Sequence, residues 1–214
     1  MSGWAVVMAV ALLACGFYLA SAALLASLEM RLGWRAMMWQ TISAHALGPG
    51  RTRFDLYGGL MIVGVLCQAL AMALHGGLGW AVPVWLCVLA AMLLGLLLFP
   101  TDSHGVEPGH HPVRARQREG FIHLYFAMGC FAAAGAIVLL GAPKMGLLVS
   151  GAVLKLLDWV AITVAGMLSL LVVTGFWRPL QVWFGLAERG FFYATAMWFI
   201  LTALALAFGH PPLD

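Results

Sequence analysis

WAVPVWLCVLAAMLLGLLLFPTDSHGVEPGHHPVRARQREGFIHLYFAMGCFAAAGAIVLLG, residues 80–141, holds two apolar runs with the most polar passage of the chain between them. Each run, 80–99 and 120–141, has about the 20 residues that a helix needs to cross a bilayer core of about 30 Å. The passage between them begins with Pro100, and proline disfavours helix in the residue before it. This stretch therefore predicts two transmembrane helices joined by a polar loop.

The same pattern extends over the rest of the chain. Hydrophobic residues make up 64% of the sequence and charged residues only 9%, whereas soluble domains carry about 25% charged residues. Polar side chains are therefore too few to cover a surface that faces water. Six apolar runs are long enough to cross a membrane: 4–27, 56–75, 80–99, 120–141, 153–176 and 190–208. The sequence predicts an all-α fold, a bundle of six transmembrane helices that forms one domain over residues 1–214.

Basic residues are concentrated in alternate loops. Loops one, three and five hold Arg31, Arg35, Arg51, Arg53, Arg114, Arg116, Arg118, Arg178 and Arg189. Loops two and four hold only Lys144. Because basic loops stay in the cytoplasm, we expect both termini on the non-cytoplasmic side of a bacterial inner (plasma) membrane. A Gly109→Cys variant should then resist an impermeant thiol reagent added to intact cells.

The distribution of the basic residues also indicates which partners to expect. The net charge of +3 follows from this topology pattern, so no nucleic-acid partner is predicted. The partners that fit are membrane lipids and other membrane subunits.

The fifth apolar run is too long for one simple span. As one helix, residues 145–176 would measure about 48 Å, so either the helix protrudes or residues 143–157 lie along the outer interface. Lys155 and Asp158 are three residues apart and can pair on one helical face. An intramembrane pair is a functional-site hypothesis. The alternative is an interfacial pair in which Lys155 extends outward to water.

Five polar residues are expected at the same end of the bundle. Asp102 and His104 follow the third helix, and His123 lies one turn inside the fourth. Ser43 and His45, in the first cytoplasmic loop, reach the same surface. Imidazole and carboxylate groups are ligands for zinc or another divalent ion, and they serve equally as general acid and base.

A plainer interpretation stands beside this one. A polar loop between two membrane helices is usually a solvated linker, and residues 103–118 fit that description. His123 fits a hydrogen bond to a neighbouring helix equally well. The chain has no catalytic or phosphate-binding motif of known spacing, so no cofactor is predicted, and a divalent metal such as zinc is the alternative left open.

Four stretches carry a family resemblance. They are LGPGRTRFDLYGGLMIVGVL (47–66), GLLLFPTDSHG (95–105), GFIHLYFAMGCF (120–131) and GLAERGFFYATAMW (185–198). In this order they resemble the bacterial membrane family called domain of unknown function 998, over nearly the whole chain. The most specific piece is Phe-Pro-Thr-Asp at the end of the third helix, followed by a histidine early in the fourth.

The resemblance implies a six-helix integral membrane protein and brings no established activity. It implies that the positions defining the family are Gly48, Pro49, Gly50, Pro100, Thr101, Asp102 and His123. Members of the family look distantly similar to eukaryotic membrane proteins concerned with lipid remodelling and lipid signalling, which is a likeness at the level of the fold.

Three functional interpretations follow. We favour a non-enzymatic membrane protein, either a subunit of a larger complex or a binder of lipid or a small hydrophobic molecule. The alternative is a membrane enzyme that acts on a lipid-like substrate at the cytoplasmic interface with Asp102 and His123. A haem or pigment binder using His123 is disfavoured, because His75 is expected at the opposite side of the membrane.

Overall fold

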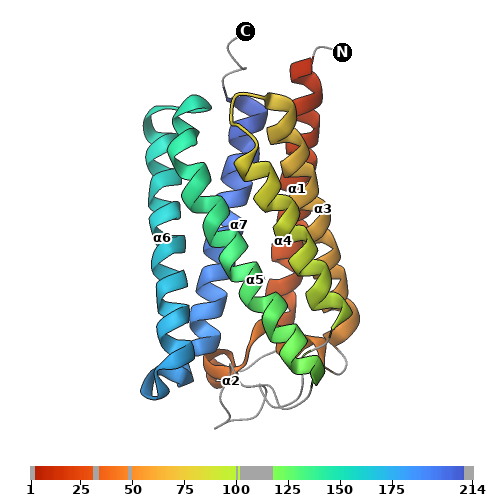
Figure 1. The fold of residues 1–214 in the computed structure, drawn as a ribbon, viewed down its shortest axis with the longest axis vertical. Helices are drawn as coiled ribbons and strands as arrows, with labels where there is room; N and C mark the ends of the chain where they lie inside the picture. Colours follow the sequence, from red (N-terminus) through yellow and green to blue (C-terminus); the bar gives the residue numbers. More distant parts are fainter. Residues whose placement is uncertain (1–2, 31–33, 48–49, 100, 102–117, 210–214) are drawn as a thin grey trace.

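Six long helices run side by side in the computed structural model, which describes residues 3–30, 34–47, 50–99, 101 and 118–209 (Figure 1). They are α1 (Gly3–Glu29), α3 (Arg51–His75), α4 (Ala81–Leu98), α5 (Arg118–Gly141), α6 (Gly151–Phe176) and α7 (Phe184–Phe208). Short helices connect them: α2 (Trp34–Trp39), η1 (Ile42–Ala46), η4 (Ala142–Leu147) and η5 (Arg178–Trp183). The described residues contain six helices long and apolar enough to cross a membrane, which confirms the predicted all-α transmembrane bundle.

The predicted helix ends were wrong where charged residues continue a helix. The first helix extends to Glu29 instead of ending at 27, the second begins at Arg51 instead of 56, and the last begins at Phe184 instead of 190. Arg51 is stabilised by Asp55 one turn later, with 3.5 Å between Nε and Oδ2 and both side chains nearly half exposed. The added turns bring charged side chains into contact with the bundle.

Residues 143–157 divide between two elements. The short helix η4 ends at Leu147, and α6 begins at Gly151. Residues 151–157 therefore belong to the fifth long helix, and only the segment before them turns between α5 and α6.

The helices are arranged so that the first and last meet. α1 packs against α3 and α7, α4 lies between α3 and α5, and α6 stands at one edge beside α7 (Figure 1). We call the end that carries α2, η1 and η5 the polar end. The first residues of α3, α5 and α7 lie there, whereas α1 begins and α7 ends at the opposite end (Figure 1). That the polar end faces the cytoplasm stays a prediction.

Tyr18 and Ser21 are buried polar residues of α1 with hydrogen-bond partners on a neighbouring helix. The Tyr18 hydroxyl of α1 donates to Oε1 of Gln68 in α3 over 2.6 Å, and the Ser21 hydroxyl donates to the carbonyl of Tyr57 over 3.2 Å. In a bilayer no water is present to satisfy such groups. These bonds therefore fix how α1 sits on α3, and the start of α3 forms one wall of the site described next.

Candidate functional site

A buried ion pair joins the first and last long helices at the polar end. Nε of Arg189 in α7 lies 2.7 Å from Oε1 of Glu29 in α1, and the two side chains are only 3% and 5% exposed. The Tyr193 hydroxyl, one turn further along α7, donates to Oε2 of Glu29 over 3.4 Å. Because a buried charge is costly without its partner, each of these two charges depends on the other.

Arg189 also holds the backbone of the α2–η1 segment. Its Nη1 donates to the carbonyl oxygens of Met37 at 3.0 Å, Gln40 at 2.6 Å and Gly185 at 3.0 Å. Met37 lies in α2, and Gln40 lies between α2 and η1. Hydrogen bonds from a charged donor are stronger than those between neutral groups. The guanidinium therefore fastens this segment onto the start of α7.

Gly185 allows the two backbones to meet. A Cβ at this position would overlap the carbonyl oxygen of Gln40 and would lie 2.8 Å from that of Met37. Only a residue without a side chain leaves room for those carbonyls next to the guanidinium.

Glu188 fixes the start of η1. Its Oε2 accepts a hydrogen bond from the backbone N–H of Ile42 over 2.7 Å, and the residue is 6% exposed. N–H groups at the start of a helix have no partner within that helix, so the carboxylate satisfies one of them. Among the residues that the structure describes, no cation lies within ion-pair distance of Glu188.

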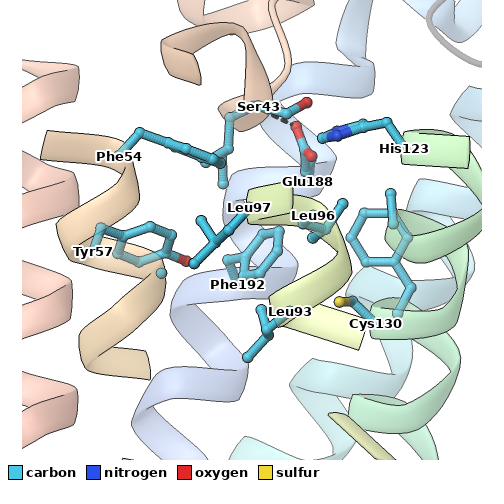
Figure 2. Close-up of a pocket in the computed structure, with 14 residues that line it drawn as sticks. Ser43, Phe54, Tyr57, Leu93, Leu96, Leu97, His123, Cys130, Glu188 and Phe192 are labelled. Atoms are coloured by element: carbon cyan, nitrogen blue, oxygen red, sulfur yellow. Dashed lines mark hydrogen bonds between the residues drawn. The ribbon is translucent and has the colours of Figure 1, made fainter. Parts of the chain in front are cut away.

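A narrow cavity of about 40 Å³ lies beside Glu188. Ser43 of η1, His123 of α5 and Glu188 of α7 gather at one end of it (Figure 2). The remaining wall is nearly all apolar. It includes Phe54, Leu93, Leu97, Cys130, Phe131 and Phe192. The cavity is therefore amphipathic, with polar groups at the polar end of the bundle and apolar groups deeper inside.

The imidazole of His123 has a defined tautomer. The residue is 4% exposed, and its Nδ1 lies 2.7 Å from the carbonyl oxygen of Phe99. A carbonyl can only accept a hydrogen bond, so Nδ1 must carry the proton. In the neutral ring Nε2 is then an acceptor, the state that suits a general base or a metal ligand. Phe99 is positioned for this bond because its backbone turns extended directly after α4.

Ser43 and His45 both lie in η1. The Ser43 hydroxyl is 3.1 Å from that of Thr41 and lines the cavity. His45 is half-buried, and its Nε2 has no hydrogen-bond partner among the described residues. Burial, and then the positive charge of Arg189, lower the pKa of the His45 imidazole, which favours the neutral ring.

The structure thus brings Ser43 and His123 to one cavity, as the sequence predicted for their end of the bundle. Asp102 and His104, predicted to join them, lie outside the described residues, so their part in a site with His123 stays a prediction. Within the described ranges, no three His, Cys, Asp or Glu side chains are grouped closely enough to hold a metal ion.

The predicted pair of Lys155 and Asp158 is not formed. Both residues lie in the second and third turns of α6 with exposed side chains, and the described part of the chain contains no ion pair between them. Because α6 is the edge helix, the two side chains lie on its outer face and point away from the bundle. His75, at the far end of α3 from the cavity, is likewise remote from His123.

Sequence reasoning missed Glu29, Glu188 and Arg189. Arg189 was predicted to lie in a loop, although it lies in α7, and the two glutamates fall outside the predicted runs 4–27 and 190–208. One indication was available: each charge directly adjoins a long apolar run, where a side chain one turn inside the helix is costly unless paired.

The fold and this cluster define a multi-pass α-helical membrane protein with an amphipathic cavity at one end. The chain belongs to the family described as "Protein of unknown function (DUF998)", whose match covers residues 12–205. No curated protein and no solved structure matches the chain.

Proposed function

We propose that this protein binds a lipid or another small hydrophobic molecule in the cavity between η1, α3, α4, α5 and α7. The observation that supports this most is the polarity of the cavity wall. Apolar side chains such as Leu93 and Phe192 line its depth, and Ser43, His123 and Glu188 stand at one end. Ligand sites are mostly apolar with a few polar groups that fix orientation.

The size of the cavity limits what can enter. A volume of 40 Å³ is room for about three water molecules by the same measure. The wall must therefore widen when a ligand enters, and a single unbranched alkyl chain requires less widening than a ring system. The chain would lie among the leucines and phenylalanines, with its head group at the polar end.

The binding proposal predicts that a substitution inside the cavity blocks labelling by a photoreactive long-chain alcohol. Ala127 of α5 lines the cavity, so Ala127→Phe should fill it. The added ring would occupy the space that the alkyl chain needs, so labelling should fall about tenfold or more. The measurement is mass spectrometry of labelled peptides from protein in lipid bilayers, with the label expected on residues such as Leu97 and Phe192.

Ala132→Phe is the matched control, because Ala132 is on the exposed face of the same helix. This variant should label like the original protein. If both variants labelled equally, or if label appeared only on the outer faces of the helices, the alcohol would not be entering this cavity.

A second candidate function is catalysis on a lipid-like substrate, and the tautomer of His123 favours it. With Nδ1 bonded to Phe99, Nε2 is the ring nitrogen that would take a proton from water or from the hydroxyl of Ser43, which lines the same cavity. Asp102 is the further residue proposed from the sequence, and a divalent metal bound by His123 and Asp102 would supply a Lewis acid there. A head group held at the polar end would be within reach of these groups.

The catalytic candidate predicts that His123→Gln lowers hydrolysis of lipid esters or amides by about 10²- to 10⁴-fold, the usual contribution of a general base. His45→Gln is the matched control, because His45 is on the same end of the bundle but is not part of the cavity wall. The purified protein is assayed in bilayers, with metal analysis of the same sample. Equal turnover in the two variants, or none in the original protein, argues for binding without catalysis.

A further inference from the structure

The Glu188 carboxyl at the polar end of the cavity has no ion-pair partner among the described residues. Glu188 is 6% exposed and lines the cavity, and its Oε2 accepts a hydrogen bond from the N–H of Ile42. A hydrogen bond from an amide reduces the cost of burying a carboxylate but supplies no positive charge to pair with it. Buried carboxylates are normally paired with a cation or bound to a metal.

The nearest cation, Arg189, already pairs with another carboxylate. Nε of Arg189 pairs with Glu29 at 2.7 Å, and Nη1 donates to three backbone carbonyl oxygens. The positive charge of Arg189 is therefore matched by Glu29. Of the three buried charges in this cluster, Glu188 is the one that faces the cavity and has no cation of its own.

Two other polar side chains stand at this end of the cavity. Nδ1 of His123 donates to the carbonyl oxygen of Phe99, and the Ser43 hydroxyl can donate or accept a hydrogen bond. Figure 2 shows these two side chains and Glu188 directed toward the same end of the cavity. A head group that carries positive charge and donates hydrogen bonds would complement the carboxylate and the hydroxyl.

We infer that the preferred ligand is an amphiphile with a protonated primary amine as its head group, held by Glu188 with the alkyl chain in the apolar part of the cavity. This inference rests on the proposed binding of a hydrophobic chain and adds the chemistry of the head. A carboxylate or phosphate head is repelled by Glu188. A quaternary ammonium balances the charge but has no N–H to donate.

The test is competition against the photoreactive alcohol in bilayers at pH 8.5, where alkylamines are still protonated and carboxylic acids are ionised. The competitors share one chain length: dodecylamine, dodecyltrimethylammonium, dodecanol and dodecanoate, each quantified per lipid. We expect dodecylamine to compete about tenfold better than dodecanol, dodecyltrimethylammonium to fall between them, and dodecanoate to be the weakest.

Glu188→Gln keeps the shape of the side chain and an oxygen for the N–H of Ile42. It should bring dodecylamine to the level of dodecanol while leaving dodecanol unchanged. Asp55→Asn is the control for cations drawn to the surface, because Asp55 is an exposed acid at the same end; it should keep the preference for the amine.

The outcomes separate the two proposals. If dodecylamine and dodecanol competed equally in the original protein, or if Glu188→Gln kept the preference, the inference about the head group would be wrong and the binding of hydrophobic chains would stand. If the photoreactive alcohol never labelled the cavity, the proposed function itself would fail. The comparison of amine, alcohol and acid in the original protein decides the inference even if Glu188→Gln does not fold.

Discussion

Replacing Arg189 with methionine is expected to lower the free energy of unfolding by about 3–5 kcal/mol, the usual cost of removing one partner of a buried ion pair. The substitution leaves Glu29 buried without a cation and takes the donor away from the carbonyl oxygens of Met37 and Gln40. The α2–η1 segment should then separate from α7. Equilibrium unfolding in mixed detergent micelles measures the change.

Two further variants test whether loss of the buried ion pair causes the expected drop in the free energy of unfolding. Arg51→Met removes an exposed pair with Asp55, and such pairs contribute about 0–1 kcal/mol, so its effect should be small. A double variant that combines Arg189→Met with Glu29→Leu should regain part of the lost stability, since no charge is left unpaired. If Arg189→Met were as mild as Arg51→Met, the ion pair would not be holding the polar end together.

Gly185→Ala should lower the free energy of unfolding nearly as much as Arg189→Met, although it adds only one methyl group. The new Cβ would overlap the Gln40 carbonyl oxygen, and backbone cannot rotate away as a side chain can. Overpacking costs about 1–3 kcal/mol, and the bonds from Arg189 to Met37 and Gln40 would be lost with it. Binding of the photoreactive alcohol should fall as well, because η1 carries Ser43.

Gly59→Ala is the matched control within another long helix. A Cβ at Gly59 would meet nothing within 4 Å, and alanine is favoured over glycine inside a helix by up to about 1 kcal/mol. This variant should be neutral or slightly more stable. If Gly185→Ala behaved like Gly59→Ala, α2 and η1 would not be seated on α7 as closely as the structure has them.

Hydropathy predicted the number of spans because apolar length is read residue by residue, and six runs have the length that a bilayer requires. It misplaced the start of α7 because the same measure treats a charge as the edge of the membrane. Arg189 can be buried within α7 because it forms an ion pair with Glu29, which lies near the other end of the sequence. A pairing over such a distance leaves no local pattern in the sequence.

The cavity was foreseen only in part. Proline after the third helix and a histidine early in the fourth placed His123 near the polar end, and Ser43 followed from its loop. Glu188 could not be assigned, because its role depends on the exact seating of η1 against α7. That position is fixed by Gly185 and by the backbone carbonyls of Met37 and Gln40. Every residue has a backbone carbonyl, so the sequence gives no sign of which ones make this contact.

The pairing of the first span with the last also constrains how the molecule is made. During synthesis Glu29 enters the membrane early, while the codon for Arg189 has not yet been translated. Until the final helix is inserted, that carboxylate has no cation, and a chain cut short before α7 never acquires one. We expect such fragments to be degraded faster than the full chain in a pulse-chase experiment, and a fragment carrying Glu29→Leu to persist longer. Completion of translation, and not the insertion of any one helix, is then the event that commits this protein to its native state.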